Sequence, residues 1–93
     1  MKINININTK YSIGDVVTAN YYNSKKKPHT MVIYKEDGRY EEVPQPFTIT
    51  DIVISIKDNT TTYELTAYTE VDGRVVTAFT RKVKEKDIIG KIN

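Results

Sequence analysis

The side chains best suited to binding chemistry lie in one short segment, in which two tyrosines precede three lysines. The segment reads Tyr21-Tyr22-Asn23-Ser24-Lys25-Lys26-Lys27-Pro28-His29-Thr30. Tyrosine rings can stack on unpaired bases and lysine ammonium groups can contact phosphates, so the segment suggests a site for single-stranded nucleic acid. The candidate contacts are Tyr21, Tyr22, Lys25, Lys26 and Lys27.

A structural role for the same segment is the alternative. One of the two tyrosines would cap the fold, and the lysines would keep a loop soluble, because runs of charge are usually solvated surface. The acidic residues Glu36, Asp37, Glu41 and Glu42 follow closely and would oppose a phosphate backbone. The net charge of +2 is also too close to neutral for the whole chain to bind nucleic acid as a polycation.

Tyrosine is the second candidate binding group, with seven copies in a chain that has no tryptophan. Two β-prone runs, residues 30–34 and 39–43, flank Asp37-Gly38, which is a strong hairpin signal. A three-residue loop would make Tyr34 and Tyr40 cross-strand partners and place them beside Val32 in an aromatic patch. The patch would either bind an extended peptide, since tyrosine supplies contact area at a small entropic cost, or pack the hairpin against the rest of the fold.

The first eight residues alternate apolar and polar side chains. Ile3, Ile5 and Ile7 would share one face of an edge strand, whose unpaired backbone could recruit a second copy of the chain. The alternation differs from the continuous apolar run of a signal peptide or a membrane span, so we expect no membrane association. The chain has no cysteine, which fits a reducing compartment, and the expected location is the cytoplasm.

Residues that support catalysis or metal binding do not fall into a known pattern. The single histidine, His29, has no cysteine to complete a metal site, and we interpret it as a solvent-exposed loop residue. No serine lies in a Gly-x-Ser-x-Gly context, and the four glycines are too far apart for a phosphate-binding loop. Glu41 and Glu42 are adjacent on a predicted strand and so point to opposite faces. We therefore expect no enzyme activity, no cofactor and no metal site.

The elements that position these residues are predicted to be almost entirely β-strands. No window of eleven or more residues has the apolar spacing of an amphipathic helix. Residues 16–22 predict one strand, and the hairpin excursion over about residues 23–46 closes at Pro44-Gln45-Pro46. Residues 47–57 predict a long strand in which the apolar positions change from odd to even, so a bulge or bend is expected near Thr50-Asp51.

Residues 63–84 predict a second hairpin, which turns at Asp72-Gly73. A two-residue loop there would put Phe79 on the face opposite Leu65. A three-residue loop with Gly73 as a bulge would instead pair Leu65 with Phe79, and we favour it because each buried Leu or Phe contributes about 1.5–3 kcal/mol. Residues 84–92 then predict a single helical turn and a short closing strand.

The segment Tyr11-Ser12-Ile13-Gly14-Asp15-Val16-Val17 predicts a tight turn before the first strand. Gly14 can take a positive φ, and the Asp15 side chain can accept hydrogen bonds from nearby backbone amides. Ile13 and Val17 are expected to face the core.

Together, Tyr11-x-Ile13-Gly14-Asp15-x-Val17, the long hairpin excursion, three β runs from Phe47 to Val83, and Lys84-Glu85-Lys86-Asp87-Ile88 resemble small SH3-like β-barrels over about residues 10–92. The resemblance implies an all-β fold, a small SH3-like barrel with an extra N-terminal strand and a long inserted β-hairpin. Such barrels include ligand-binding adaptors, RNA- and DNA-binding domains and phage-encoded accessory proteins, and aromatics on the excursion can line a groove for an extended peptide.

With 93 residues, the chain has room for one core, and we expect a single domain over residues 1–93. Its many Lys, Asn, Ile and Tyr residues have AT-rich codons, which suggests a bacterial or phage origin. The sequence predicts a non-enzymatic interaction module with a protein or peptide partner, and single-stranded nucleic acid is the alternative ligand.

Overall fold

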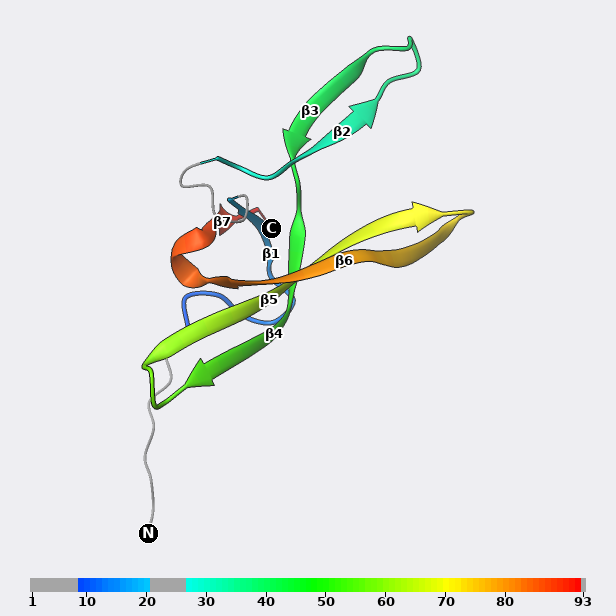
Figure 1. The fold of residues 1–93 in the computed structure, drawn as a ribbon. Helices are drawn as coiled ribbons and strands as arrows, with labels where there is room; N and C mark the ends of the chain where they lie inside the picture. The colour runs from blue at the N-terminus through cyan, green and yellow to red at the C-terminus, as the bar shows by residue number, and fades with distance from the viewer. Residues whose placement is uncertain (1–8, 21–26, 93) are drawn as a thin grey trace.

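The part of the chain that the structure describes folds into seven β-strands and one turn of 3-10 helix (Figure 1). The computed structural model describes residues 9–20 and 27–92. The elements are β1 (Val16–Ala19), β2 (Thr30–Tyr34), β3 (Tyr40–Pro44), β4 (Phe47–Ser55), β5 (Thr60–Val71), β6 (Arg74–Lys84), η1 (Glu85–Asp87) and β7 (Ile88–Lys91). The predictions of an all-β fold and of a helical turn before a short last strand are confirmed.

The strands form two antiparallel sheets. The main sheet has the order β6-β5-β4-β1-β7, and β2 and β3 form a separate pair, which confirms the predicted hairpin excursion. Within the described residues no pairing joins the edge strands β6 and β7, so the main sheet is open at both edges instead of closing by hydrogen bonds into a barrel. The predicted edge strand at residues 1–8 and the predicted strand end at Tyr21 and Tyr22 lie outside the described residues.

The turn before β1 has the predicted backbone conformation. Gly14 has a φ of 95°, and its N–H donates a hydrogen bond of 2.8 Å to the carbonyl of Ile49. The carboxylate of Asp15 accepts a hydrogen bond of 2.9 Å from the N–H of Ser12 and forms an ion pair of 3.3 Å with Lys91 on β7. The Ser12 hydrogen bond and the Lys91 charge hold the pKa of Asp15 below its usual range.

The turn places its apolar residues differently from the prediction. Val17 is fully buried, as predicted, but the expectation for Ile13 is wrong because its side chain is 64% exposed. The strand begins at Val16, and the alternation of faces applies only within a strand. Tyr11, which lies before the turn, supplies the buried aromatic ring instead.

A bulge in β4 confirms the prediction from the change of apolar phase. Ile49 pairs with Leu65 and Asp51 pairs with Glu64, which leaves Thr50 as an extra residue between the two pairs. The extra residue shifts the alternation by one position, so apolar side chains before and after it can face the same core.

The hairpin between β5 and β6 has a register that the sequence interpretation missed. Asp72 and Gly73 form a two-residue loop with φ values of 51° and 78°, as in a type I′ turn, so the favoured three-residue loop is wrong. The expected consequence of the two-residue loop is also wrong. A register shift leaves Ala78 unpaired and places Phe79 opposite Ala67, on the core side of the sheet.

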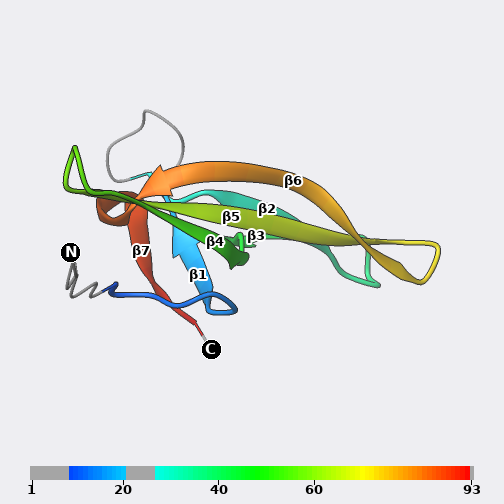
Figure 2. The same cartoon turned by 90° about the horizontal axis from the view of Figure 1, so that it is seen from below.

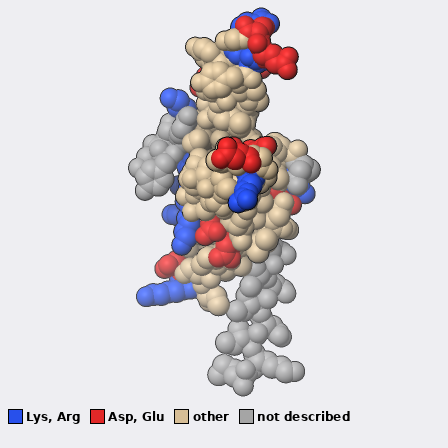
Figure 3. Space-filling model, turned by 90° about the vertical axis from the view of Figure 1, so that its right-hand side faces the viewer, with Lys and Arg blue, Asp and Glu red and all other residues tan. Residues whose placement is uncertain are grey.

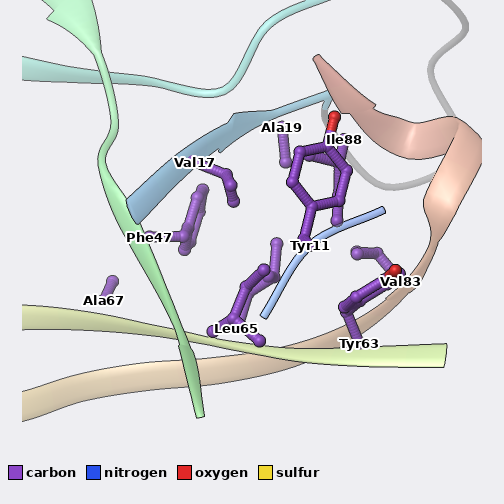
Figure 4. Packing of buried hydrophobic residues seen from close by; sticks show 10 residues of the cluster. Tyr11, Val17, Ala19, Phe47, Tyr63, Leu65, Ala67, Val83 and Ile88 are labelled. Atoms are coloured by element: carbon purple, nitrogen blue, oxygen red, sulfur yellow. The ribbon is translucent and has the colours of Figure 1, made fainter. Parts of the chain in front are cut away.

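The core lies inside the main sheet, between its β4–β5–β6 part and its β1–β7 part, and the segment before β1 packs beside it (Figure 4). Its buried members are Tyr11, Val17, Ala19, Phe47, Ile49, Tyr63, Leu65, Ala67, Val83 and Ile88. The rings of Tyr11 and Tyr63 meet edge to face at 5.8 Å.

The carboxylate of Glu85 accepts two hydrogen bonds at the edge of this core. The hydroxyl of Tyr63 donates a hydrogen bond of 2.9 Å to Oε1 of Glu85, which also accepts one of 3.2 Å from the N–H of Lys10. Burial, together with the hydrogen bond to the carboxylate, raises the pKa of the Tyr63 hydroxyl. The helical turn η1 therefore anchors the segment before β1 to β5.

Candidate interaction surface

The β2–β3 hairpin is fixed to the main sheet at its base, around His29. The N–H of His29 donates to the carbonyl of Ala19 at 2.8 Å, and the His29 carbonyl accepts from the N–H of Gln45 at 2.9 Å. The imidazole lies 5.4 Å from the ring of Phe47 and 5.7 Å from that of Phe79, centroid to centroid. His29 is thus a half-buried packing residue, and its interpretation as a solvent-exposed loop residue is wrong.

The surroundings of this imidazole disfavour its protonated form. Burial lowers the pKa of His29, and the positive charge of Arg81 lowers it further. The guanidinium of Arg81 lies 5.9 Å from the ring centroid of Phe47, so it covers the edge of the same aromatic cluster.

The far end of the hairpin has a three-residue loop, the condition under which Tyr34 and Tyr40 were expected to pair. Tyr34 pairs with Tyr40, the N–H of Lys35 donates to the carbonyl of Arg39 at 2.8 Å, and Gly38 takes the positive φ of 85° that such a loop requires. The loop carries an ion pair of 2.6 Å between Arg39 and Asp37.

Tyr34 and Tyr40 form an exposed aromatic pair near this loop. Their ring centroids are 6.4 Å apart, and the residues are 79% and 72% exposed. The alternation of faces puts Val32 beside Tyr34, and Val32 is also exposed. We call Val32, Tyr34 and Tyr40 the tyrosine face. It does not pack against the main sheet, which was the alternative role for these residues.

The predicted lysine segment is described only in part. Lys27 is exposed, whereas Tyr21, Tyr22, Lys25 and Lys26 lie outside the described residues. On β6, Lys82 and Lys84 alternate with the buried Val83 and so share the outer face of the main sheet. Of the predicted binding residues that the structure describes, Tyr34 and Tyr40 lie together.

Charged side chains gather at the tips of the two hairpins, and the surface between the tips is mostly uncharged (Figure 3). The hairpins also expose apolar residues that were not among the predicted binding residues. They are Ile33 on β2 and Tyr68, Val71, Val75, Val76 and Phe79 on β5 and β6. In the sequence, the sign of such exposed residues on β6 is the run of β-prone, uncharged residues from 75 to 80.

Among the residues that the structure describes, no group of three or more His, Asp or Glu side chains is placed to hold a metal ion. No helix in the described part of the chain is long and apolar enough to cross a membrane. Comparisons of the chain with protein-family models, with curated proteins and with solved structures gave no match.

Proposed function

We propose that the chain is a non-enzymatic interaction module that binds a protein or peptide through the tyrosine face. The observation that carries this proposal is the pairing of two largely exposed tyrosines on a hairpin whose base is fixed by hydrogen bonds and ring packing. Tyrosine has few rotatable bonds and combines a large apolar ring with a hydroxyl, so it is enriched at protein interfaces. A face held in place before binding also loses little entropy when a partner binds.

The surroundings of the tyrosine face favour a protein over nucleic acid. Glu42 lies opposite Val32 on the same face, where its carboxylate accepts a hydrogen bond of 2.9 Å from the Thr30 hydroxyl. A phosphate backbone laid across the hairpin would meet this negative charge at close range. A peptide can instead offer apolar side chains to the tyrosines and a donor to the carboxylate.

The architecture that we propose for the module is SH3-like. Two features support this proposal: β1 lies between β4 and β7, and a 3-10 turn leads into the last strand. The hairpin then occupies the long connection that follows the first strand.

A displayed peptide library, panned against the labelled chain, tests the proposed function. We expect bound peptides to lose about tenfold or more in affinity for a Tyr34→Ala/Tyr40→Ala variant, because exposed tyrosines in an interface are frequent hot spots. The matched control is Tyr68→Ala, which removes an exposed tyrosine from the other hairpin and should leave binding unchanged. Equal losses in both variants would contradict the proposal.

Binding of the alternative ligand, single-stranded nucleic acid, is measured in a separate titration. Labelled oligo-dT and oligo-rU are titrated with the chain over a series of salt concentrations. Affinity for these strands that falls with salt, and that disappears in a Lys25→Ala/Lys26→Ala/Lys27→Ala variant, would assign the chain to single-stranded nucleic acid instead.

A further inference from the structure

Two arms extend from the main sheet toward the same side of the molecule, as two perpendicular views show (Figures 1 and 2). The hairpin arm is the β2–β3 pair, residues 30–44. The ribbon arm is the far part of the β5–β6 pair, residues 68–77, in which every residue is exposed. The two arms meet at their base, where His29, which directly precedes the hairpin arm, contacts Phe79, which lies just beyond the ribbon arm on β6.

The ribbon arm carries apolar side chains on the face that continues the core. Val76 pairs with Thr69, two positions along β5 from the buried Ala67, so Val76 lies on the same face as the core. Its exposure of 39%, against 73% for Val75 on the opposite face, agrees with this placement. Val71 extends the same face toward the tip of the arm.

The hairpin arm is apolar on both faces. One face is the tyrosine face. The other, which follows from His29 by alternation, carries Met31, Ile33 and Val43. A two-stranded hairpin is marginally stable by itself, and strands that are apolar on both faces are typical of elements covered on both sides. In the described residues, Ile33 and the tyrosine face remain exposed.

The charges at the two ends of the arms are complementary. At the tip of the hairpin arm, Asp37 pairs with Arg39 and Glu41 pairs with Lys35 at 3.2 Å, which leaves Glu36 as an excess negative charge. The base of the arms carries the positive charge of Arg81. An occupant that resembles the hairpin arm, inserted tip first, would bring opposite charges together.

From these observations we infer that the exposed apolar faces of the two arms are covered by the hairpin arm of a second copy of this chain. Each copy inserts its hairpin arm between the two arms of the other around a two-fold axis, so the interface closes as a dimer. The layers are then ribbon arm, partner's hairpin arm, hairpin arm and partner's ribbon arm. The two hairpin arms meet through the face that carries Ile33, and each tyrosine face meets the ribbon face that carries Val76 and Phe79.

The inference rests on the proposed function, because it names the protein that the tyrosine face contacts. Sedimentation velocity of the full chain over a wide range of concentrations tests it. The expected species has twice the monomer mass of 10.7 kDa. Val76→Asp should weaken the dimer at least about tenfold because it buries an unpaired carboxylate, whereas Val75→Asp, on the outer face, is the matched control and should leave the dimer unchanged.

Two further variants probe the order of the layers. Tyr34→Ala/Tyr40→Ala should also give monomers, since the tyrosine face lies inside the stack. Glu36→Lys should weaken the dimer about twofold to fivefold, as expected for an exposed ion pair, and more at low salt than at high salt. Circular dichroism of each variant shows whether it retains the fold.

The outcomes separate this inference from the proposed function. A chain that stays monomeric, yet binds peptides in a manner that depends on Tyr34 and Tyr40, overturns the dimer and leaves the proposed function in place. A dimer that survives Val76→Asp, or that Val75→Asp disrupts equally, overturns the arm exchange. A monomeric chain whose tyrosine face binds no peptide contradicts both.

Discussion

The stability of the core edge should depend on the acceptor that Glu85 offers to Tyr63. Tyr63 is fully buried, and its hydroxyl donates to the Glu85 carboxylate at 2.9 Å. Glu85→Ala removes the acceptor of both this hydroxyl and the N–H of Lys10. A buried donor left without a partner costs about 1–3 kcal/mol, so we expect the free energy of unfolding to fall by about that amount.

Removal of the Tyr63 hydroxyl should lower the free energy of unfolding by less than removal of the Glu85 carboxylate. Tyr63→Phe keeps the ring that packs on Tyr11 and leaves the Glu85 carboxylate exposed to water, so we expect a loss of about 0.5–1.5 kcal/mol. Glu85→Gln keeps an oxygen acceptor and should cost less than Glu85→Ala. Glu85→Ala acts through the Tyr63 hydroxyl, so it should lower the free energy of unfolding by less in a Tyr63→Phe background. The costs of the two substitutions should therefore be less than additive.

Urea unfolding at pH 7, followed by circular dichroism, measures the free energy of unfolding of the wild type, the three single variants and the double variant. In thermal scans, each 1 kcal/mol should lower Tm by about 4–8 °C for a domain of this size. Glu70→Ala on the exposed ribbon is the control and should stay within about 0.5 kcal/mol of the wild type. Strictly additive costs of Glu85→Ala and Tyr63→Phe, or equal costs of the Ala and Gln variants at position 85, would refute the reasoning.

Three further predictions concern the pH dependence of stability and the first turn. Burial and Arg81 depress the pKa of folded His29, so the unfolded state binds a proton more readily below about pH 6.5. The free energy of unfolding should therefore fall as the pH drops from about 6.5 through the folded pKa. His29→Phe should remove this fall in urea titrations at several pH values. Asp15 also has a depressed pKa, so its contribution to the free energy of unfolding is complete above about pH 3.9 and is lost as the pH falls through the folded pKa. Asp15→Asn should reduce this loss of stability at acid pH. An unchanged loss would contradict the assignment. Gly14→Ala should cost about 1–2 kcal/mol in urea unfolding because of its positive φ, whereas Gly90→Ala, at an open position without a positive φ, should cost nothing.

The local sequence predicted much of the fold because its signals depend on neighbouring residues. Asp37-Gly38 predicted the position of the hairpin turn, and the change of apolar phase near Thr50 predicted the bulge in β4. The pairing of Tyr34 with Tyr40 was expected for a three-residue loop at this turn. These features need only the backbone preferences of a few residues and the alternation of strand faces.

Predictions that depended on how distant parts of the chain pack against each other were less successful. The register of the β5–β6 hairpin depends on a bulge at Ala78, which lets a two-residue turn coexist with Phe79 on the core side. The placement of His29 against Phe47 and Phe79 depends on where β2 leaves the main sheet. Both features depend on packing between residues that are not neighbours in the sequence, because Phe79 lies opposite Ala67 and the His29 ring contacts both Phe47 and Phe79.

For this protein, the sequence by itself determined the class of fold, the turns and the candidate tyrosines, because turn chemistry and alternation act over a few residues. Only the tertiary structure decided which of these residues remain on the surface. It directed Tyr34 and Tyr40 away from the main sheet, packed His29 into the base of the hairpin, and left the ribbon arm exposed on both faces. The physical reason is that burial depends on which strands lie across from each other, and the pairing of distant strands fixes that arrangement.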